Sequence, residues 1–154
     1  MLFVCTGNTC RSPMAEAIAR HLAAERGLGD VEVGSAGTSA WEGAPASDGS
    51  LLVGIEHGLD LSQHRARQLT RELVDSSDII FAMSPHHLER VEALGGVGKS
   101  YLLTAYASHG TSGRAVSDPV GGDLEIYRAT FDELEREIRK AMDRIAAERA
   151  SGPR

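Results

Sequence analysis

The chain has 154 residues and a net charge of −6, and 42% of its residues are hydrophobic and 25% charged. This composition is that of a soluble globular protein, and the length predicts a single domain over residues 1–154. No apolar run approaches the roughly 18 residues of a membrane span, and the opening MLFVC resembles a short strand and shows neither a basic start nor a cleavage site. We therefore expect a cytoplasmic protein without a membrane partner. The basic residues are scattered, which argues against nucleic acid as a partner.

Apolar runs of strand length alternate with helical patterns, which is typical of βαβ units and of a parallel sheet covered by helices. The segments 38–50 and 107–123 are rich in turn-forming and polar residues and are predicted to be loops. In chain order, we predict a strand at 2–5, a helix at 12–26, a strand at 31–34, helices at 48–57 and 70–74, a strand at 78–83, a helix capped by Ser84, a strand at 100–106 and a helix at 124–149.

The segment CTGNTCRS, from Cys5 to Ser12, links the first strand to the first helix. A loop in this position points successive backbone N–H groups into one concavity, and the helix N-terminus adds positive potential. Gly7 and Asn8 tolerate the positive φ angles of such a curl, and the Arg11 guanidinium can bind two phosphate oxygens at once. The loop therefore predicts a site for phosphate or other oxyanions, formed by Thr6, Gly7, Asn8, Thr9, Cys10, Arg11 and Ser12.

Cys5 opens this loop, where the backbone donors, the helix end and Arg11 would all stabilise its thiolate. Ser12 is placed to hydrogen-bond the sulfur. A thiolate beside an anion site is the arrangement needed to attack phosphorus, so the loop predicts phosphoryl transfer to water through a cysteinyl-phosphate. A buried cysteine is often only a small apolar residue. That interpretation leaves the glycine, asparagine, arginine and serine of the loop unexplained.

The leaving group needs a proton, which a carboxylic acid on a nearby loop can supply. Asp118 is the predicted acid, because it lies in the long loop before the last helix and Pro119 stiffens the backbone behind it. The alternative interpretation is that Asp-Pro merely starts a turn. Asp123 is the weaker candidate for the acid, because it is placed to cap the last helix.

The two cysteines, Cys5 and Cys10, are too close in sequence for a disulfide to constrain the fold. A reversible bridge between them is a hypothesis for protecting the nucleophile from overoxidation. Neither cysteines nor histidines show zinc spacing, so no metal and no cofactor are predicted. We expect surface positions for His57, His86, His87 and His109.

Four segments together resemble the low-molecular-weight protein-tyrosine phosphatases: VCTGNTCRSPMAEA at the start, SAGT at 35–38, HRARQ at 64–68 and DPVGG at 118–122. The resemblance implies a three-layer α/β fold whose four-stranded parallel sheet has the order 2-1-3-4 with helices on both faces. It implies metal-independent catalysis, with Cys5 as nucleophile, Arg11 as the clamp on the phosphate and Asp118 as general acid, then general base. It also implies that Ser35 and His64 support the loop through hydrogen bonds with Asn8 and Ser12.

Three residues bear on the substrate, which the resemblance implies to be a phosphorylated protein. Phosphotyrosine-directed members generally carry a bulky aliphatic residue where this chain has Thr9, and aromatic residues after Asp-Pro, where it has Val120. The loop with threonine resembles that of bacterial protein-arginine phosphatases, whose polar phosphoguanidinium suits a hydroxyl. We therefore expect phosphoarginine, with phosphotyrosine as the alternative, although arginine phosphatases also tend to have an aromatic residue after Asp-Pro. Trp41 suits either substrate, because its ring can meet a phenyl group or a cation, and it could equally cover the edge of the core.

Two other classes remain as alternatives. Arsenate reductases of this fold relay a disulfide through further cysteines, which this chain lacks. A non-catalytic phosphate-binding module would have little need for Cys5, Arg11, Ser12 and Asp118 together. An enzyme that works as a monomer or weak dimer is the preferred interpretation.

Overall fold

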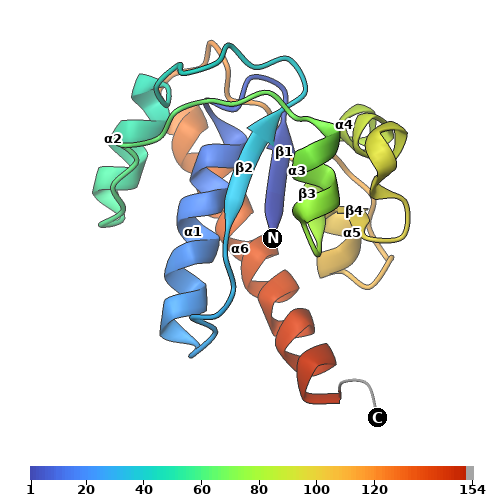
Figure 1. Cartoon of the computed structure of the whole chain (residues 1–154). Coiled ribbons are helices and arrows are strands. Elements are labelled where there is room, and N and C mark those ends of the chain that lie inside the picture. The colour runs from blue at the N-terminus through green and yellow to red at the C-terminus, as the bar shows by residue number, and fades with distance from the viewer. Residues whose placement is uncertain (152–154) are drawn as a thin grey trace.

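Four short parallel strands form one sheet in the order β2-β1-β3-β4, as the resemblance implies. The structure is a computed structural model that describes residues 1–151. Figure 1 shows the sheet between two layers of helices. In chain order the elements are β1 (Leu2–Cys5), α1 (Arg11–Glu25), β2 (Gly34–Gly37), α2 (Asp48–Glu56), α3 (Arg71–Ser76), β3 (Ile80–Ala82), α4 (Pro85–Val91), a wide helical turn η1 (Glu92–Gly96), β4 (Ser100–Leu102), α5 (Leu103–Ala107) and α6 (Leu124–Ser151).

The side chains of β1 alternate between the two faces of the sheet, and both faces are covered. Phe3 and Cys5 join a core with residues of α1, α5 and α6, including Met14, Leu103 and Phe131. On the opposite face, a smaller core combines residues of β1, β2 and β3 with residues of the α3–α4 layer: Leu2, Val4, Ala36, Leu69, Val74, Ile80 and Val91. The predicted α/β class with helices on both faces is confirmed.

Three predicted strands have different bounds in the structure: the third is shorter, at Ile80–Ala82 instead of 78–83, and the second and fourth differ more. The second strand lies at Gly34–Gly37, three residues later than the β-branched Val31 and Val33 suggested. Its small residues pair with all four residues of β1 and let neighbouring segments approach closely. A Cβ on Gly37 would lie 2.4 Å from the backbone oxygen of Thr6. Tertiary contact thus outweighed the local strand propensity.

The fourth strand ends at Leu102, and the apolar residues that follow form helix α5 instead of extending the strand to residue 106. Leu103 and Tyr106 are buried in the core of the α1–α6 face, with the Tyr106 ring packed edge-on against Phe81. Short apolar runs do not distinguish a strand from a buried helix by periodicity. The prediction for this segment was therefore wrong.

Two predicted helix caps are confirmed by hydrogen bonds. Thr70 Oγ1 accepts from the backbone N–H of Leu73 at 3.2 Å, and Asp123 Oδ1 accepts from that of Ile126 at 3.1 Å. Ser84 precedes α4 as predicted, but its hydroxyl does not cap the helix. The Asp123 side chain therefore has a structural role at the start of α6.

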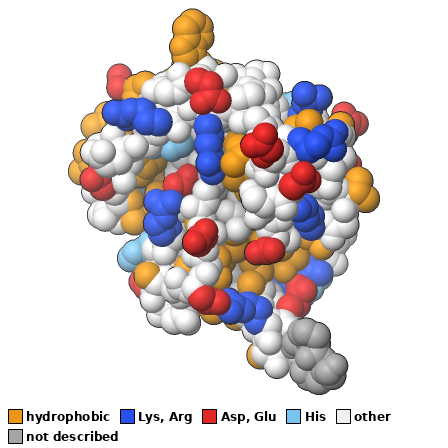
Figure 2. Space-filling model, in the orientation of Figure 1, with side chains coloured by type: hydrophobic (Ala, Val, Ile, Leu, Met, Phe, Trp, Pro, Cys, Tyr) orange, Lys and Arg blue, Asp and Glu red, His pale blue; other side chains and the backbone are white. Residues whose placement is uncertain are grey.

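Acidic and basic side chains are interspersed on the face of the molecule shown in Figure 2. Of the helices within residues 1–151, none is long and apolar enough to cross a bilayer. At the carboxyl ends of the strands, the loop before α6 crosses the same end of the molecule as the loop after β1 (Figure 1). These loops carry the residues that the sequence marks as reactive.

Candidate functional site

The loop from Cys5 to Ser12 leaves the carboxyl end of β1 and curls directly into α1. Asn8 takes the left-handed conformation, with φ of 56°, whereas Gly7 does not. The end of β2 holds the outer side of the curl, because the backbone N–H groups of Thr38 and Ser39 donate to the carbonyls of Cys5 and Thr6, both at 2.9 Å. The loop is thus fixed by the backbone of the adjacent strand.

Asn8 lies fully buried behind the loop and connects it to two distant segments. Its Nδ2 donates to Ser12 Oγ at 2.7 Å and to Ser35 Oγ at 2.9 Å. Its Oδ1 accepts from the backbone N–H of Arg67 at 2.9 Å, and its backbone oxygen lies 2.6 Å from His64 Nε2. The structure thus brings together the residues that the family resemblance grouped.

The sulfur of Cys5 lies 2.9 Å from Ser12 Oγ, and both residues are buried. Because Ser12 Oγ accepts from Asn8 Nδ2, its own hydrogen is free to point to the sulfur. A hydroxyl that donates to sulfur favours the thiolate over the thiol. The network behind the loop therefore orients the group that contacts the candidate nucleophile.

The Arg11 guanidinium links the loop to the candidate acid. Nη1 donates to Ser84 Oγ at 3.2 Å and to the backbone oxygen of Val116 at 3.0 Å, while Nη2 lies 3.4 Å from Asp118 Oδ2. Asp118 is exposed, and its Oδ1 also accepts from the backbone N–H of Val120 at 3.1 Å. Asp118 thus forms the turn that the alternative interpretation expected and also faces the arginine of the loop.

Cys10 is buried at the start of α1, and its sulfur contacts Ser47 Oγ at 3.4 Å and Tyr127 OH at 3.3 Å. Burial, with the Cys10 hydrogen bond as a second cause, raises the pKa of Tyr127. Cys5 and Cys10 are both free thiols. The reversible bridge between them stays a prediction.

This arrangement matches a known family over nearly the whole chain. The family described as "Low molecular weight phosphotyrosine protein phosphatase" matches residues 1–151. The chain belongs to the low-molecular-weight protein-tyrosine phosphatase family. It is accordingly a cysteine-dependent protein phosphatase.

Similar members of the family carry two different substrate names. The chain is 39% identical over 150 residues to a protein-arginine-phosphatase of Geobacillus stearothermophilus, covering 96% of this chain and 97% of that protein. It is 39% identical over 132 residues to the low-molecular-weight protein-tyrosine-phosphatase PtpB of Staphylococcus haemolyticus, covering 86% of this chain and 89% of that protein. Among solved structures, a Cys-to-Ser variant of the YwlE arginine phosphatase with a phosphorylated active-site serine superposes with a TM-score of 0.90 at 36% identity, covering 97% of each chain.

One histidine near the phosphatase loop contradicts the expectation from sequence. His57, His86 and His109 are exposed, as predicted, although the His57 ring stacks on Phe131. His87 is fully buried, because α4 turns its third residue toward the loop, and its Nε2 lies 2.7 Å from Thr6 Oγ1. Burial lowers the pKa of His87 to about 3, and the nearby His86 and Arg11 act in the same direction while Asp118 opposes them.

The three candidate specificity residues of this phosphatase differ in how they are held. Thr9 is partly buried, with its backbone oxygen accepting from Ser47 N at 2.9 Å and from Ser50 Oγ at 3.2 Å. Trp41 is 83% exposed and Val120 is 67% exposed. The alternative that Trp41 covers the edge of the core is therefore wrong.

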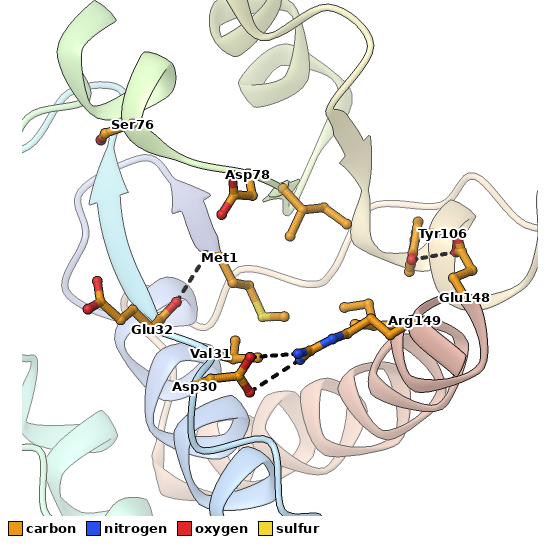
Figure 3. A pocket seen from close by; sticks show the side chains of 11 residues that line it. Met1, Asp30, Val31, Glu32, Ser76, Asp78, Tyr106, Glu148 and Arg149 are labelled. Carbon is orange, nitrogen blue, oxygen red and sulfur yellow. Dashed lines mark hydrogen bonds and ion pairs between the residues drawn. The ribbon is translucent and has the colours of Figure 1, made fainter. Parts of the chain in front are cut away.

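A pocket of about 610 Å³ lies away from the phosphatase loop, at the amino ends of the strands (Figure 3). Asp30 and Arg149 form an ion pair at its wall, and Tyr106 donates to Glu148 at 2.8 Å. It contains none of the loop residues, and its acidic side chains are opposite in sign to what a phosphate would need. We therefore place the functional site at the loop.

Sequence reasoning missed several residues that touch the phosphatase loop. They come from the segments around α2 and α4, from the segment before α3 and from α6. Arg67 lies within the motif HRARQ, whereas no local motif marks the others. They are Ser47, Ser50, Arg67, Ser84, His87 and Tyr127. Glu16 does not touch the loop itself, but it accepts from Ser35 Oγ at 2.6 Å and so supports the Asn8 network. Hydrogen-bonding side chains at the starts of α2 and α4 were the available signal.

Proposed function

We propose that the chain removes phosphate from phosphoarginine in proteins, through a cysteinyl-phosphate on Cys5. The observation that carries the substrate proposal is Thr9. Its backbone is fixed by Ser47 and Ser50, while its hydroxyl, among residues 1–151, contacts only the sulfur of Cys10, at 3.7 Å. That hydroxyl can meet a polar guanidinium, whereas the aliphatic side chain of phosphotyrosine-directed relatives favours an apolar ring. The protein-arginine-phosphatase of Geobacillus stearothermophilus supports the same substrate.

In the first step, the thiolate of Cys5 attacks phosphorus, so that an S–P bond forms and the P–N bond breaks. The loop N–H groups and Arg11 hold the phosphoryl oxygens as charge develops on them. The carboxyl group of Asp118 gives its proton to the departing guanidine nitrogen. The position of Asp118 supports this role, because its Oδ2 lies 3.4 Å from Arg11 Nη2, at the edge of the phosphate site.

In the second step, water attacks the phosphocysteine, so that an O–P bond forms and the S–P bond breaks. The carboxylate of Asp118 now accepts the proton of the water, and phosphate leaves the loop. The sulfur returns as a thiolate, which Ser12 stabilises through the contact at 2.9 Å. Free phosphate and similar oxyanions are therefore expected to bind as product-like inhibitors.

We also infer that residues 1–154 form one domain that works in the cytoplasm as a monomer or weak dimer on a phosphorylated protein substrate, without nucleic acid or a membrane as partner. The site supports the domain inference, because it is built from residues between Cys5 and Tyr127 that converge on one sheet. The last three residues, 152–154, lie outside the part of the chain described.

Phosphotyrosine is the second candidate substrate, with the same chemistry and an oxygen leaving atom. The exposed ring of Trp41 favours it, since an aromatic side chain in the loop after β2 could contact a phenyl ring. PtpB of Staphylococcus haemolyticus supports this alternative.

The deciding experiment compares kcat/KM on phosphoarginine and phosphotyrosine peptides for the wild type and Thr9→Ile, with Cys5→Ser as the inactive control. We expect the wild type to prefer phosphoarginine and the isoleucine variant to shift toward phosphotyrosine. A wild type that already prefers phosphotyrosine would overturn the substrate proposal and make Trp41→Ala the next variant to measure.

A further inference from the structure

The turn from β3 into α4 contacts the phosphate loop at two points. Ser84 Oγ accepts from Arg11 Nη1, near the end of the loop, and His87 Nε2 contacts Thr6 Oγ1, near its beginning. The Asn8 network holds the loop through β2 and the segment 64–67, whereas this turn holds it from the β3 side. His87 is thus part of the support of the site.

The hydrogen-bonding partners of the His87 ring identify its tautomer. Nδ1 is buried and has no partner among the described residues, whereas Nε2 has Thr6 Oγ1 at 2.7 Å. The low pKa of His87 leaves the ring neutral near pH 7, with one N–H to place. A buried N–H without an acceptor is rare and costly, so the proton belongs on Nε2.

This tautomer determines what the Thr6 hydroxyl can do. Once Nε2–H donates to Thr6 Oγ1, the hydroxyl hydrogen cannot point back to the ring, which offers it no lone pair on that side. Thr6 is exposed and follows Cys5 directly in the loop, while His87 beneath it is fully buried. The hydroxyl hydrogen is therefore not used in the contact with the ring and is free for an acceptor elsewhere.

We propose that His87 is a positioning residue whose Nε2–H holds Thr6 so that the Thr6 hydroxyl donates to the phosphoryl group bound in the loop. The inference concerns the phosphate and not the group that carries it. It therefore holds whether the substrate is phosphoarginine or phosphotyrosine, and it can fail while the substrate proposal stands.

The first test is the tautomer itself, measured by long-range ¹⁵N–¹H NMR on the imidazoles of the wild type between pH 5 and 8. We expect His87 as the neutral Nε2–H form throughout this range, beside Arg11, Asp118 and His86. A ring protonated on Nδ1, or one that titrates near pH 6, would overturn the proposal.

The second test uses an aryl phosphate as substrate and inorganic phosphate as competitive inhibitor, so that it is independent of the arginine question. Thr6→Val and His87→Leu are each expected to weaken phosphate inhibition and to lower kcat/KM by about tenfold, as for loss of one hydrogen bond to an anion. The double variant is expected to be no worse than either single one, because both remove the same donor. His87→Gln, whose amide nitrogen can take the place of Nε2, should retain most of the activity.

His21→Gln is the matched control, since this exposed histidine pairs with Glu25 on α1 and has no hydrogen bond to the loop or to His87 among the described residues. Thermal unfolding of each variant separates folding from function. If the double variant multiplied the two losses, or if His87→Gln were as impaired as His87→Leu, His87 would only support packing and the proposal would be wrong. Should His87→Leu fail to fold, Thr6→Val, His87→Gln and the NMR result decide.

Discussion

Replacing Asn8 with alanine is expected to destabilise the protein by about 3 to 5 kcal/mol. The side chain makes hydrogen bonds of 2.7 Å to Ser12, 2.9 Å to Ser35 and 2.9 Å to the backbone of Arg67, each with a net value of about 1 kcal/mol. The Arg67 N–H would lose its side-chain acceptor, and alanine at φ of 56° adds about 1 kcal/mol of backbone strain.

Urea unfolding of the wild type, Asn8→Ala and Asn8→Gly measures these contributions separately. The glycine variant loses the same hydrogen bonds but adopts the left-handed conformation readily, so it should be about 1 kcal/mol more stable than the alanine variant. A loss below about 1 kcal/mol for Asn8→Ala would refute the role of this residue as the anchor of the loop. A glycine variant less stable than the alanine variant would refute the backbone argument.

Two further predictions concern the close approach of β2 and the protonation of His87. Gly37→Ala is expected to displace the loop and abolish inhibition by phosphate, because its Cβ would lie 2.4 Å from Thr6 O. Gly29→Ala, with open space at its Cβ, is the control and should behave as the wild type. Normal phosphate inhibition in Gly37→Ala would contradict this prediction. Folding lowers the pKa of His87 from its ordinary 6.5 to about 3. The unfolded chain therefore binds a proton at this residue below pH 6.5, whereas the folded protein does so only near pH 3. The contribution of His87 to the free energy of unfolding is thus complete above pH 6.5, and it falls toward pH 3 by at most about 1.4 kcal/mol per pH unit. Urea unfolding at pH 7, 5 and 4 should show a steeper loss for the wild type than for His87→Gln, and equal slopes would contradict the prediction.

The chemistry of the loop could be predicted from eight consecutive residues. Cys5, Arg11 and Ser12 surround one short curl between a strand and a helix, and the geometry of such a curl is largely local. The parallel sheet was equally predictable, because hydrophobic periodicity reports burial on each face. Asp118 could be proposed as the general acid because the leaving group needs a proton and because this carboxylate lies in the long loop before the last helix.

The support of the loop could not be predicted in the same way. Ser35 and His64 were reached only through the family resemblance, and His87 was expected at the surface. Its burial depends on how α4 packs against β3 and β4, which no pattern in PHHLERV reveals. The predicted bounds of β2 were wrong for a similar reason. The segment GSAG has little strand propensity, and it forms the strand because its small residues allow the close approach to the loop.

The amino-acid sequence therefore determined the fold class, the reactive loop and the need for an acid, since each depends on residue types at short spacing. Only the tertiary structure decided which distant side chains complete the loop, because hydrogen bonds between segments 27 to 117 residues apart follow from packing and not from local propensity. The same packing determined the ionisation of His87, since burial beneath Thr6, rather than its neighbours in sequence, is the main cause of its low pKa.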